Sequence, residues 1–242
     1  MWTAGILIIG NEILTSKVQD ENAPYLLREL RALGIDVRRV HVIPDVIQEI
    51  ADEIRSFSRQ FRYVLTTGGV GPTHDDVTMD GAALAFGRKL ELNASMDQLL
   101  RNTLRGREPN ASQLKMCMLP EGSELISTPD LWFPLIKLEN VFIFPGIPRL
   151  LRAKFEALKP MLEGRPVFLR RVYLSCIESD IAASLNEVVA EFGEVDVGSY
   201  PATEKRDYRT QITLESRDED LVARAVKALI GKLPADVLLR VE

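Results

Sequence analysis

The sequence has few of the residues that stabilise small secreted proteins or span membranes. Its two cysteines, Cys117 and Cys176, lack a CxxC partner and cannot build a disulfide framework. No apolar run approaches the roughly 18 residues that a membrane-spanning helix needs. The first residues carry neither a basic segment nor a small-residue cleavage site. We therefore expect a cytoplasmic protein with reduced thiols and no membrane partner.

The charge balance argues against nucleic-acid binding, and the low aromatic content limits the number of residues that could stack on a ligand. With 30 basic and 35 acidic residues among 242, the formal net charge is −5, which argues against a broad nucleic-acid surface. Aromatic residues make up 7% of the chain and leave few stacking platforms. Hydrophobic residues at 46% and charged residues at 27% are typical of a globular chain, long enough for one large domain or for a large and a small one.

Strand-like and helix-like segments alternate through the first two thirds of the chain. This alternation predicts an α/β domain whose mostly parallel sheet is covered on both faces. We expect Asn22 to cap a helix that ends at Gly34. The stretch 108–133 has mixed signals and receives no assignment. The expected strands are 5–9, 36–42, 62–66 and 141–144, and the expected helices are 21–33, 46–57, 79–86, 95–107 and 149–162.

A short linker at 163–166 separates this part from a self-contained pattern of strands and helices. The pattern has the order β-α-β-β-α-β, which is that of the ferredoxin-like, or split βαβ, fold. We therefore expect two domains, 1–164 and 165–242. In the second, the expected strands are 167–175, 195–200, 208–216 and 236–241, and the expected helices are 178–192 and 218–233.

The segment 63–78 says most about function. A buried-looking strand is followed by Gly68, Gly69 and Gly71, and glycines let the backbone take positive φ and approach a ligand closely. Asp75 and Asp76 follow them. Backbone amides beside carboxylates, at the carboxyl end of a strand, favour a metal-bridged phosphate. The alternative is an ordinary tight turn with solvated acids.

Other acidic residues follow the ends of the expected strands. Glu12, Asp45 and Asp80 would gather with the glycine-rich loop in one crevice, because parallel strands end at the same edge. Carboxylate and phosphate oxygens suit Mg²⁺, Mn²⁺ or Co²⁺. Helix capping is the alternative for Asp45 and Asp76. His74 would bond a phosphate or move a proton, and no G-x-S-x-G motif supports acyl transfer.

Several strings resemble a known family. They are GNEIL at 10–14, VQDENAPYLLRELRALGI at 18–35, VIPD at 42–45, TTGGVGPTHDDVT at 66–78 and FPGIP at 144–148. These are similar to the molybdopterin-binding-like family, which includes the MoaB and Mog proteins and the N-terminal part of CinA. Within it, the chain looks most similar to the molybdopterin-binding-like domain of eukaryotic FAD synthase. The strings behind that likeness are FRYVLTTGGVGPTHDDVT, FPLIKLENVFIFPGIPRLLR and VGSYP.

The resemblance implies a three-layer α/β/α (MoaB/Mog-like) domain with a pocket at the strand ends. Mog-like members handle molybdopterin through aspartates that fall on Asp45 and Asp76. CinA-like and FAD-synthase-like members are associated with divalent-metal-dependent cleavage of the pyrophosphate of ADP-ribose or FAD, helped by K⁺ and notably by Co²⁺. At 130–134, DLWFP stands where CinA proteins carry GTAPG. This departure favours the FAD-synthase-like branch.

We therefore expect a nucleotide pyrophosphatase that cleaves FAD or a related dinucleotide such as ADP-ribose, with Co²⁺ or Mg²⁺, and K⁺, as cofactors. A molybdopterin-binding protein of molybdenum cofactor biosynthesis without hydrolase activity is the alternative. A third possibility makes the C-terminal unit an interaction module and the first domain catalytically silent. The partner is a small-molecule nucleotide or pterin, and a homo-oligomer is expected.

The expected site residues fall into three groups. The catalytic residues are Asp45, Asp76 and His74, and the metal ligands are Asp45, Asp75, Asp76 and Asp80. The phosphate or nucleotide is expected at Gly10, Asn11, Glu12, Thr67, Gly68, Gly69, Gly71, Pro72, Thr73, Pro145 and Gly146.

Overall fold

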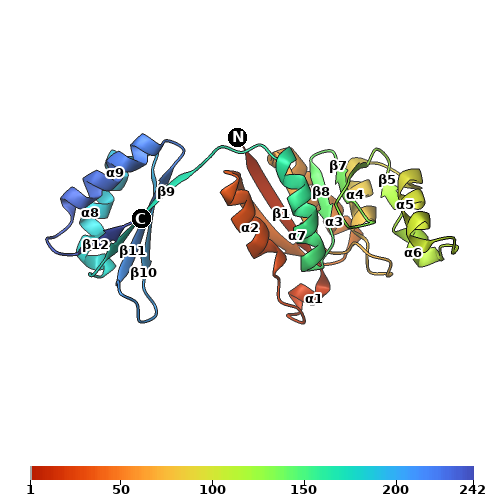
Figure 1. Cartoon of the computed structure of the whole chain (residues 1–242), viewed down its shortest axis with the longest axis horizontal. Coiled ribbons are helices and arrows are strands. Elements are labelled where there is room, and N and C mark those ends of the chain that lie inside the picture. Colours follow the sequence, from red (N-terminus) through yellow and green to blue (C-terminus); the bar gives the residue numbers. More distant parts are fainter. Residues whose placement is uncertain (1) are drawn as a thin grey trace. The chain divides into compact units, whose positions relative to one another are not determined.

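The computed structural model describes residues 2–242 and shows two compact units. Among the described residues, the N-terminal unit comprises 2–164 and the C-terminal unit 165–242 (Figure 1). Each unit has a sheet of its own, six-stranded in the first and four-stranded in the second. No helix among residues 2–242 is long and apolar enough to cross a membrane.

The sheet of the N-terminal unit has the order β2-β1-β3-β8-β7-β6. Its first four strands are parallel, and β7 and β6 continue it antiparallel. The strand bounds, in sheet order, are Asp36–Ile43, Thr3–Ile9, Tyr63–Thr67, Val141–Phe144, Leu135–Leu138 and Glu124–Ile126. The carboxyl ends of β1, β3 and β8 therefore meet at one edge, as the alternating pattern predicts.

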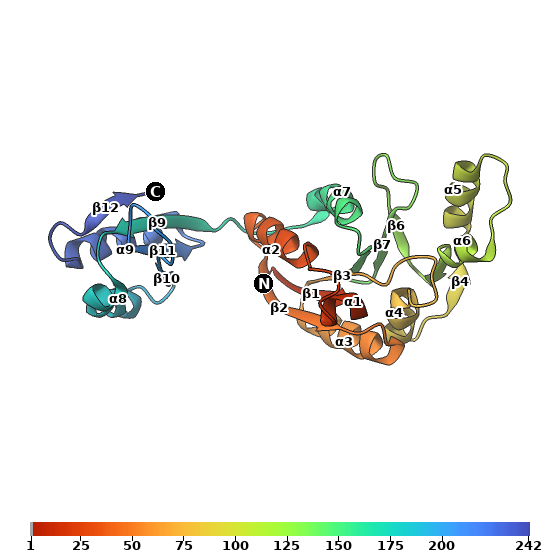
Figure 2. The ribbon, with the colours of Figure 1, turned by 90° about the horizontal axis from the view of Figure 1, so that it is seen from below.

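Helices cover both faces of this sheet (Figure 2). Helices α2 (Asn22–Ala32) and α7 (Pro148–Leu158) lie on one face, and α3 (Ile47–Gln60) and α4 (Thr78–Phe86) on the other. A 3₁₀ turn, η1 (Lys159–Met161), follows α7. The predicted three-layer α/β/α fold with a mostly parallel sheet is confirmed.

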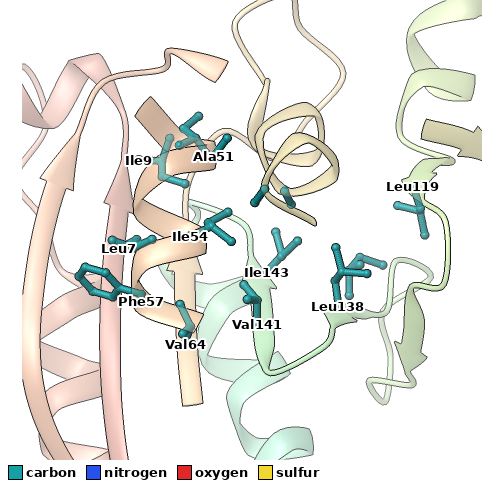
Figure 3. Close-up of a cluster of buried hydrophobic side chains, with 14 of the residues drawn as sticks. Leu7, Ile9, Ala51, Ile54, Phe57, Val64, Leu119, Leu138, Val141 and Ile143 are labelled. Atoms are coloured by element: carbon teal, nitrogen blue, oxygen red, sulfur yellow. The ribbon is translucent and has the colours of Figure 1, made fainter. Parts of the chain in front are cut away.

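Alternation along β1 explains why the unit has two cores. Ile6 and Ile8 face α2 and α7, whereas Leu7 and Ile9 face α3 and α4. Successive side chains of a strand point to opposite faces, so a strand buried on both sides reads as one apolar run. Figure 3 shows the core on the side of α3 and α4, in which Phe57 of α3 lies beside Leu7 of β1.

Short elements fill the stretch that the sequence left unassigned. Helix α5 (Ala94–Leu104), expected at 95–107, precedes this stretch. Within the stretch lies α6 (Ala111–Lys115), whose start is held by a capping box of Asn110 and Gln113. Strand β5 (Met118–Pro120) pairs with β4 (Leu90–Leu92) in a separate ribbon. A single turn, α1 (Asn11–Leu14), follows β1 and was also not expected.

The C-terminal unit has the element order β9, α8, β10, β11, α9, β12. The bounds are Phe168–Leu174, Glu178–Glu191, Asp196–Pro201, Thr210–Ser216, Glu219–Lys232 and Leu238–Val241. Its antiparallel sheet has the order β10-β11-β9-β12. Apolar residues of the strands and both helices form one buried core. The predicted ferredoxin-like arrangement is confirmed.

Candidate functional site

A pocket of about 700 Å³ lies where β1, β3 and β8 end. This volume is within the range of small-molecule sites. The glycine turn after β3 and the loop after β8 contribute to its wall, together with the start of α2 and part of α7. The lining ranges are 8–9, 12–13, 18–22, 67–72, 131–133 and 145–148, with Asp76, Met116, Leu150 and Lys154.

The glycine turn has a backbone conformation and a close packing that favour glycine. Gly68 and Gly69 have φ of 102° and 60°. A Cβ on Gly68 would lie 1.9 Å from the carbonyl oxygen of Ile9, and one on Gly69 would lie 2.4 Å from Oγ1 of Thr78. Thr78 fixes the turn, because its Oγ1 donates to Gly68 O at 2.8 Å and its amide donates to Gly69 O at 3.1 Å. The turn therefore presents rigid backbone to the pocket.

Asp76 lies in the pocket wall against this turn. Its Oδ2 accepts hydrogen bonds from the amide of Thr73 at 2.8 Å and from Thr73 Oγ1 at 2.5 Å. A Cβ on Gly71 would lie 2.6 Å from the same oxygen. The alternative that Asp76 caps α4 is wrong, because Val77 is the N-cap and no side chain caps that helix. Contacts with Gly71 and Thr73 orient the carboxylate instead.

Asp45 supports the site from outside the pocket. Its Oδ2 accepts a hydrogen bond from the amide of Asn11 at 2.8 Å, and its Oδ1 lies 3.4 Å from the position of a Cβ on Gly69. The carboxylate thereby joins the turn after β1 to the glycine turn. The capping alternative is wrong here too, because Val46 is the N-cap of α3 and no side chain caps it.

The structure brings only part of the expected residues together. Asp80 lines a smaller cavity of about 190 Å³, whose wall shares Gly69, Gly71 and Asp76 with the main pocket. The side chains of His74 and Asp75 are 98% and 64% exposed. The expected residues that line the main pocket are Glu12, Thr67, Gly68, Gly69, Gly71, Pro72, Asp76, Pro145 and Gly146. Those outside it are Gly10, Asn11, Asp45, Thr73, His74, Asp75 and Asp80.

The four expected metal ligands do not form one cluster. Within residues 2–242, no group of three His, Cys, Asp or Glu side chains is placed to hold a metal ion. Asp76 and Asp80 nevertheless share the smaller cavity. Two carboxylates suit Mg²⁺ when substrate phosphates supply further ligands. Asp76 and Asp80 are therefore the two expected ligands that share a cavity, and the wall of that cavity also includes Lys115.

Asn22 is a site residue that the sequence assigned to another role. Its side chain is buried, and its Nδ2 donates to Thr67 Oγ1 at 2.9 Å and to Gly146 O at 2.7 Å. It therefore ties the ends of β3 and β8 together. The expected cap role is wrong, because Asp20 accepts from the amides of Asn22 and Ala23. Glu21 is the N-cap of α2 and makes no side-chain capping bond, so Asp20, two residues before the helix, is the residue that satisfies its first amides.

Lys154 is a pocket residue that the sequence analysis missed. It is 1% exposed on α7, and its Nζ donates to the carbonyl oxygens of Phe133 and Pro134, each at 2.5 Å. The Nζ also lies 4.7 Å from the ring centroid of Phe133. Burial lowers the pKa of the ammonium from 10.5 to about 7. The sequence signal is a lysine on the buried stripe of Leu151, Phe155 and Leu158.

The segment at 130–134 supplies an apolar wall. Leu131, Trp132 and Phe133 line the pocket, and the last two rings meet edge to face with centroids 5.5 Å apart. Both rings also pack against the core shared with α3 and α4. The departure from the CinA pattern therefore falls at the pocket itself.

The fold and the pocket define a class, namely three-layer α/β proteins that bind small molecules where parallel strands end in a glycine turn. Residues 5–164 match the family model described as "Probable molybdopterin binding domain". The chain belongs to this molybdopterin-binding-domain family, as its sequence motifs predicted. Residues 166–242 match a second model, "FAD synthase, middle domain".

Individual relatives agree with both assignments. The chain is 32% identical over 262 residues to a "Probable FAD synthase" of Caenorhabditis briggsae, covering 96% of this chain and 49% of that protein. It thus spans about half the length of that relative. A protein of Archaeoglobus fulgidus is 35% identical, with 92% of this chain and 94% of that protein covered. The solved CinA structure from Thermoplasma acidophilum matches with a TM-score of 0.62 and 27% identity, over 66% of this chain and 98% of that one.

Proposed function

We propose that the chain hydrolyses the diphosphate bridge of FAD or a related dinucleotide such as ADP-ribose. Water would add across one P–O bond of the bridge, so that FAD yields AMP and FMN. The observation that carries this proposal is the pairing of a rigid glycine turn with the Asp76 carboxylate in a pocket of about 700 Å³. The likeness to proteins named FAD synthase supports a flavin dinucleotide as the substrate.

The start of α7 supports a phosphate site beside the glycine turn. Gly146, Ile147 and Pro148 line the pocket, and Pro148 begins this 11-residue helix. No side chain caps the helix. Its amino end therefore directs the positive end of the helix dipole at the pocket, where anions are stabilised. Helix α2 contributes less, because Asp20 already accepts from its first amides.

Asp76 and Asp80 would hold a divalent ion, Co²⁺ or Mg²⁺, jointly with the diphosphate, and K⁺ would assist binding of the phosphates. When bound, such an ion activates water and offsets charge on phosphoryl oxygens. Thr73 keeps the Asp76 carboxylate oriented through two hydrogen bonds to Oδ2. Asp45 holds the turn after β1 beside the glycine turn by accepting a hydrogen bond from the Asn11 amide. His74, with a side chain 98% exposed, has no role in this proposal.

AMP release tests the proposal directly. FAD, ADP-ribose and NADH are incubated with the protein and K⁺ in EDTA, Mg²⁺ or Co²⁺. The Asp76→Asn variant keeps an oxygen acceptor for Thr73 but loses the charge, so release should fall by roughly 100-fold or more. Asp75→Asn is the matched control, because it removes a neighbouring carboxylate that lies outside the pocket. Turnover that survives in folded Asp76→Asn protein would contradict the proposal.

The family match favours one alternative. A protein of the molybdopterin-binding-domain family would use the same turn to hold a pterin phosphate and hydrolyse nothing. In that case no combination of nucleotide and metal releases AMP, although the circular dichroism spectrum shows a folded protein. Molybdopterin binds, and its binding depends on residues of the pocket. Asp76→Asn would then weaken molybdopterin binding and Asp75→Asn would not.

A further inference from the structure

We infer that Lys154 and the Trp132–Phe133 segment form a binding subsite for a planar heteroaromatic ring that carries a carbonyl group. Flavins and pterins have this chemistry, whereas adenine lacks the carbonyl. The inference deepens the proposed function, on which it rests for the choice of pocket. The glycine turn and the aspartates would contact the phosphates of the ligand, and this subsite would contact its ring.

The distance along α7 separates this subsite from the phosphate end of the pocket. Pro148 begins the helix at the phosphate end, and Lys154 lies six residues later. At a rise of 1.5 Å per residue, the two positions are about 9 Å apart along the helix axis. Both line the same pocket. A ligand whose diphosphate lies at the helix start can therefore place a ring beside Lys154.

In its charged form, Lys154 has one proton left for a ligand. An ammonium has three donors, and two are used by Phe133 O and Pro134 O. Among residues 2–242, the hydrogen bonds of the Lys154 ammonium go to Phe133 O and Pro134 O alone, and no carboxylate pairs with it. A buried charge without a counterion is costly. Donation to a ligand oxygen would satisfy the remaining proton.

The surroundings of Lys154 favour a neutral ring over a phosphate. Besides the two carbonyls, the ammonium faces the ring of Phe133, and Trp132 and Leu131 line the adjoining pocket wall. Bringing a phosphate into this apolar wall would require removing its hydration. A planar ring gains stacking from the aromatic side chains, and its carbonyl accepts from the ammonium.

Lys154 also positions the aromatic wall. Its two hydrogen bonds hold the backbone of Phe133 and Pro134, and thus the loop that carries Trp132. The bonds join α7 to a segment about 20 residues earlier. Loss of the ammonium should therefore weaken ring binding in two ways, through the lost donor and through a less ordered wall.

Calorimetric titration with free ring compounds at pH 6, where Lys154 is charged, tests the inference without any hydrolysis. Riboflavin and neopterin carry ring carbonyls but no diphosphate, and adenosine provides the comparison without a carbonyl. Riboflavin or neopterin should bind at least roughly 10-fold tighter than adenosine, as one charge-assisted hydrogen bond provides. The tighter of the two distinguishes a flavin from a pterin ligand. Equal affinity for all three compounds overturns the inference.

Variants identify the residues. Lys154→Met and Trp132→Leu should each weaken binding of the preferred ring compound by roughly 10- to 100-fold, while Trp132→Phe should restore most of the affinity. Lys159→Met is the matched control, because this lysine lies outside the pocket and pairs with Glu29 and Glu156. If Lys154→Met does not fold, the ring affinities of Trp132→Leu and Trp132→Phe test the subsite instead. Unchanged ring affinity in folded Trp132→Leu or Lys154→Met protein overturns the inference.

AMP release measured in parallel separates this inference from the proposed function. Ring binding that depends on Lys154 without any AMP release would support the subsite and contradict the hydrolase. AMP release from FAD and ADP-ribose with no preference for riboflavin or neopterin over adenosine would contradict the subsite alone.

Discussion

The buried ammonium of Lys154 should make the stability of the N-terminal unit rise with pH. Burial lowers the pKa of Lys154 from 10.5 to about 7. Between these two pH values the unfolded chain binds one proton more than the folded chain, so unfolding becomes less favourable as the pH rises. The destabilisation is full below pH 7 and disappears as the pH approaches 10.5.

The magnitude follows from the lowered pKa. Each tenfold change in proton affinity corresponds to about 1.4 kcal/mol, so the full destabilisation is about 5 kcal/mol. Between pH 6 and pH 9, wild-type protein should therefore gain about 2 to 3 kcal/mol relative to Lys154→Met. Methionine also leaves the carbonyls of Phe133 and Pro134 without their donor. This loss is independent of pH, so it does not affect the slope.

Urea unfolding of the two proteins at pH 6, 7, 8 and 9 measures this gain. The two tryptophans of the chain, Trp2 and Trp132, both lie in the N-terminal unit, so their fluorescence reports that unit alone. Other titrating groups are common to both proteins and cancel in the difference. A constant difference across the four pH values would refute the reasoning. It would mean that the two carbonyls and the Phe133 ring keep the ammonium charged throughout.

The remaining predictions concern the glycine turn and Asn22. Gly68→Ala should cost roughly 3 kcal/mol or more in urea unfolding, because φ is positive and the new Cβ would meet Ile9 O. Gly87→Ala, with positive φ but open space, should cost only about 1 kcal/mol. Asn22→Ala should cost roughly 2 kcal/mol and weaken FAD binding, since two hydrogen bonds at the pocket are lost. Asn102 is exposed, so Asn102→Ala should change neither the stability nor FAD binding. Equal effects of Asn22→Ala and Asn102→Ala would contradict the proposed role of Asn22 at the pocket.

Hydrophobic periodicity accounts for most of the fold. The apolar runs of β1 and β3 are enough to identify both strands, because strands of a parallel sheet are buried on both faces. The stripe of Ile50, Ile54 and Phe57 likewise identifies α3. Periodicity fails between residues 108 and 133, where β5 and β6 have three residues each. Strands of that length contain too few alternations to be recognised.

Only part of the candidate site could be read from the chain. Gly68 and Gly69 were recognisable because a cluster of glycines after a strand indicates positive φ. The sequence identified Asp45 and Asp76 as site residues but did not predict their orientation. Hydrogen bonds from Asn11 and Thr73 determine which way each carboxylate points. Asn22 shows the same limit, since the bonds that define its role go to residues 45 and 124 positions away.

The sequence by itself determined the family, the two-unit pattern of strands and helices, and the location of the glycine turn, because these depend on local residue patterns. Only the tertiary structure decided that Asp76 faces the pocket, that Asp45 and His74 do not line it, and that Lys154 is buried against the Phe133 loop. These features depend on contacts between segments that fold together from distant parts of the chain. Burial and hydrogen-bond partners arise only from those contacts.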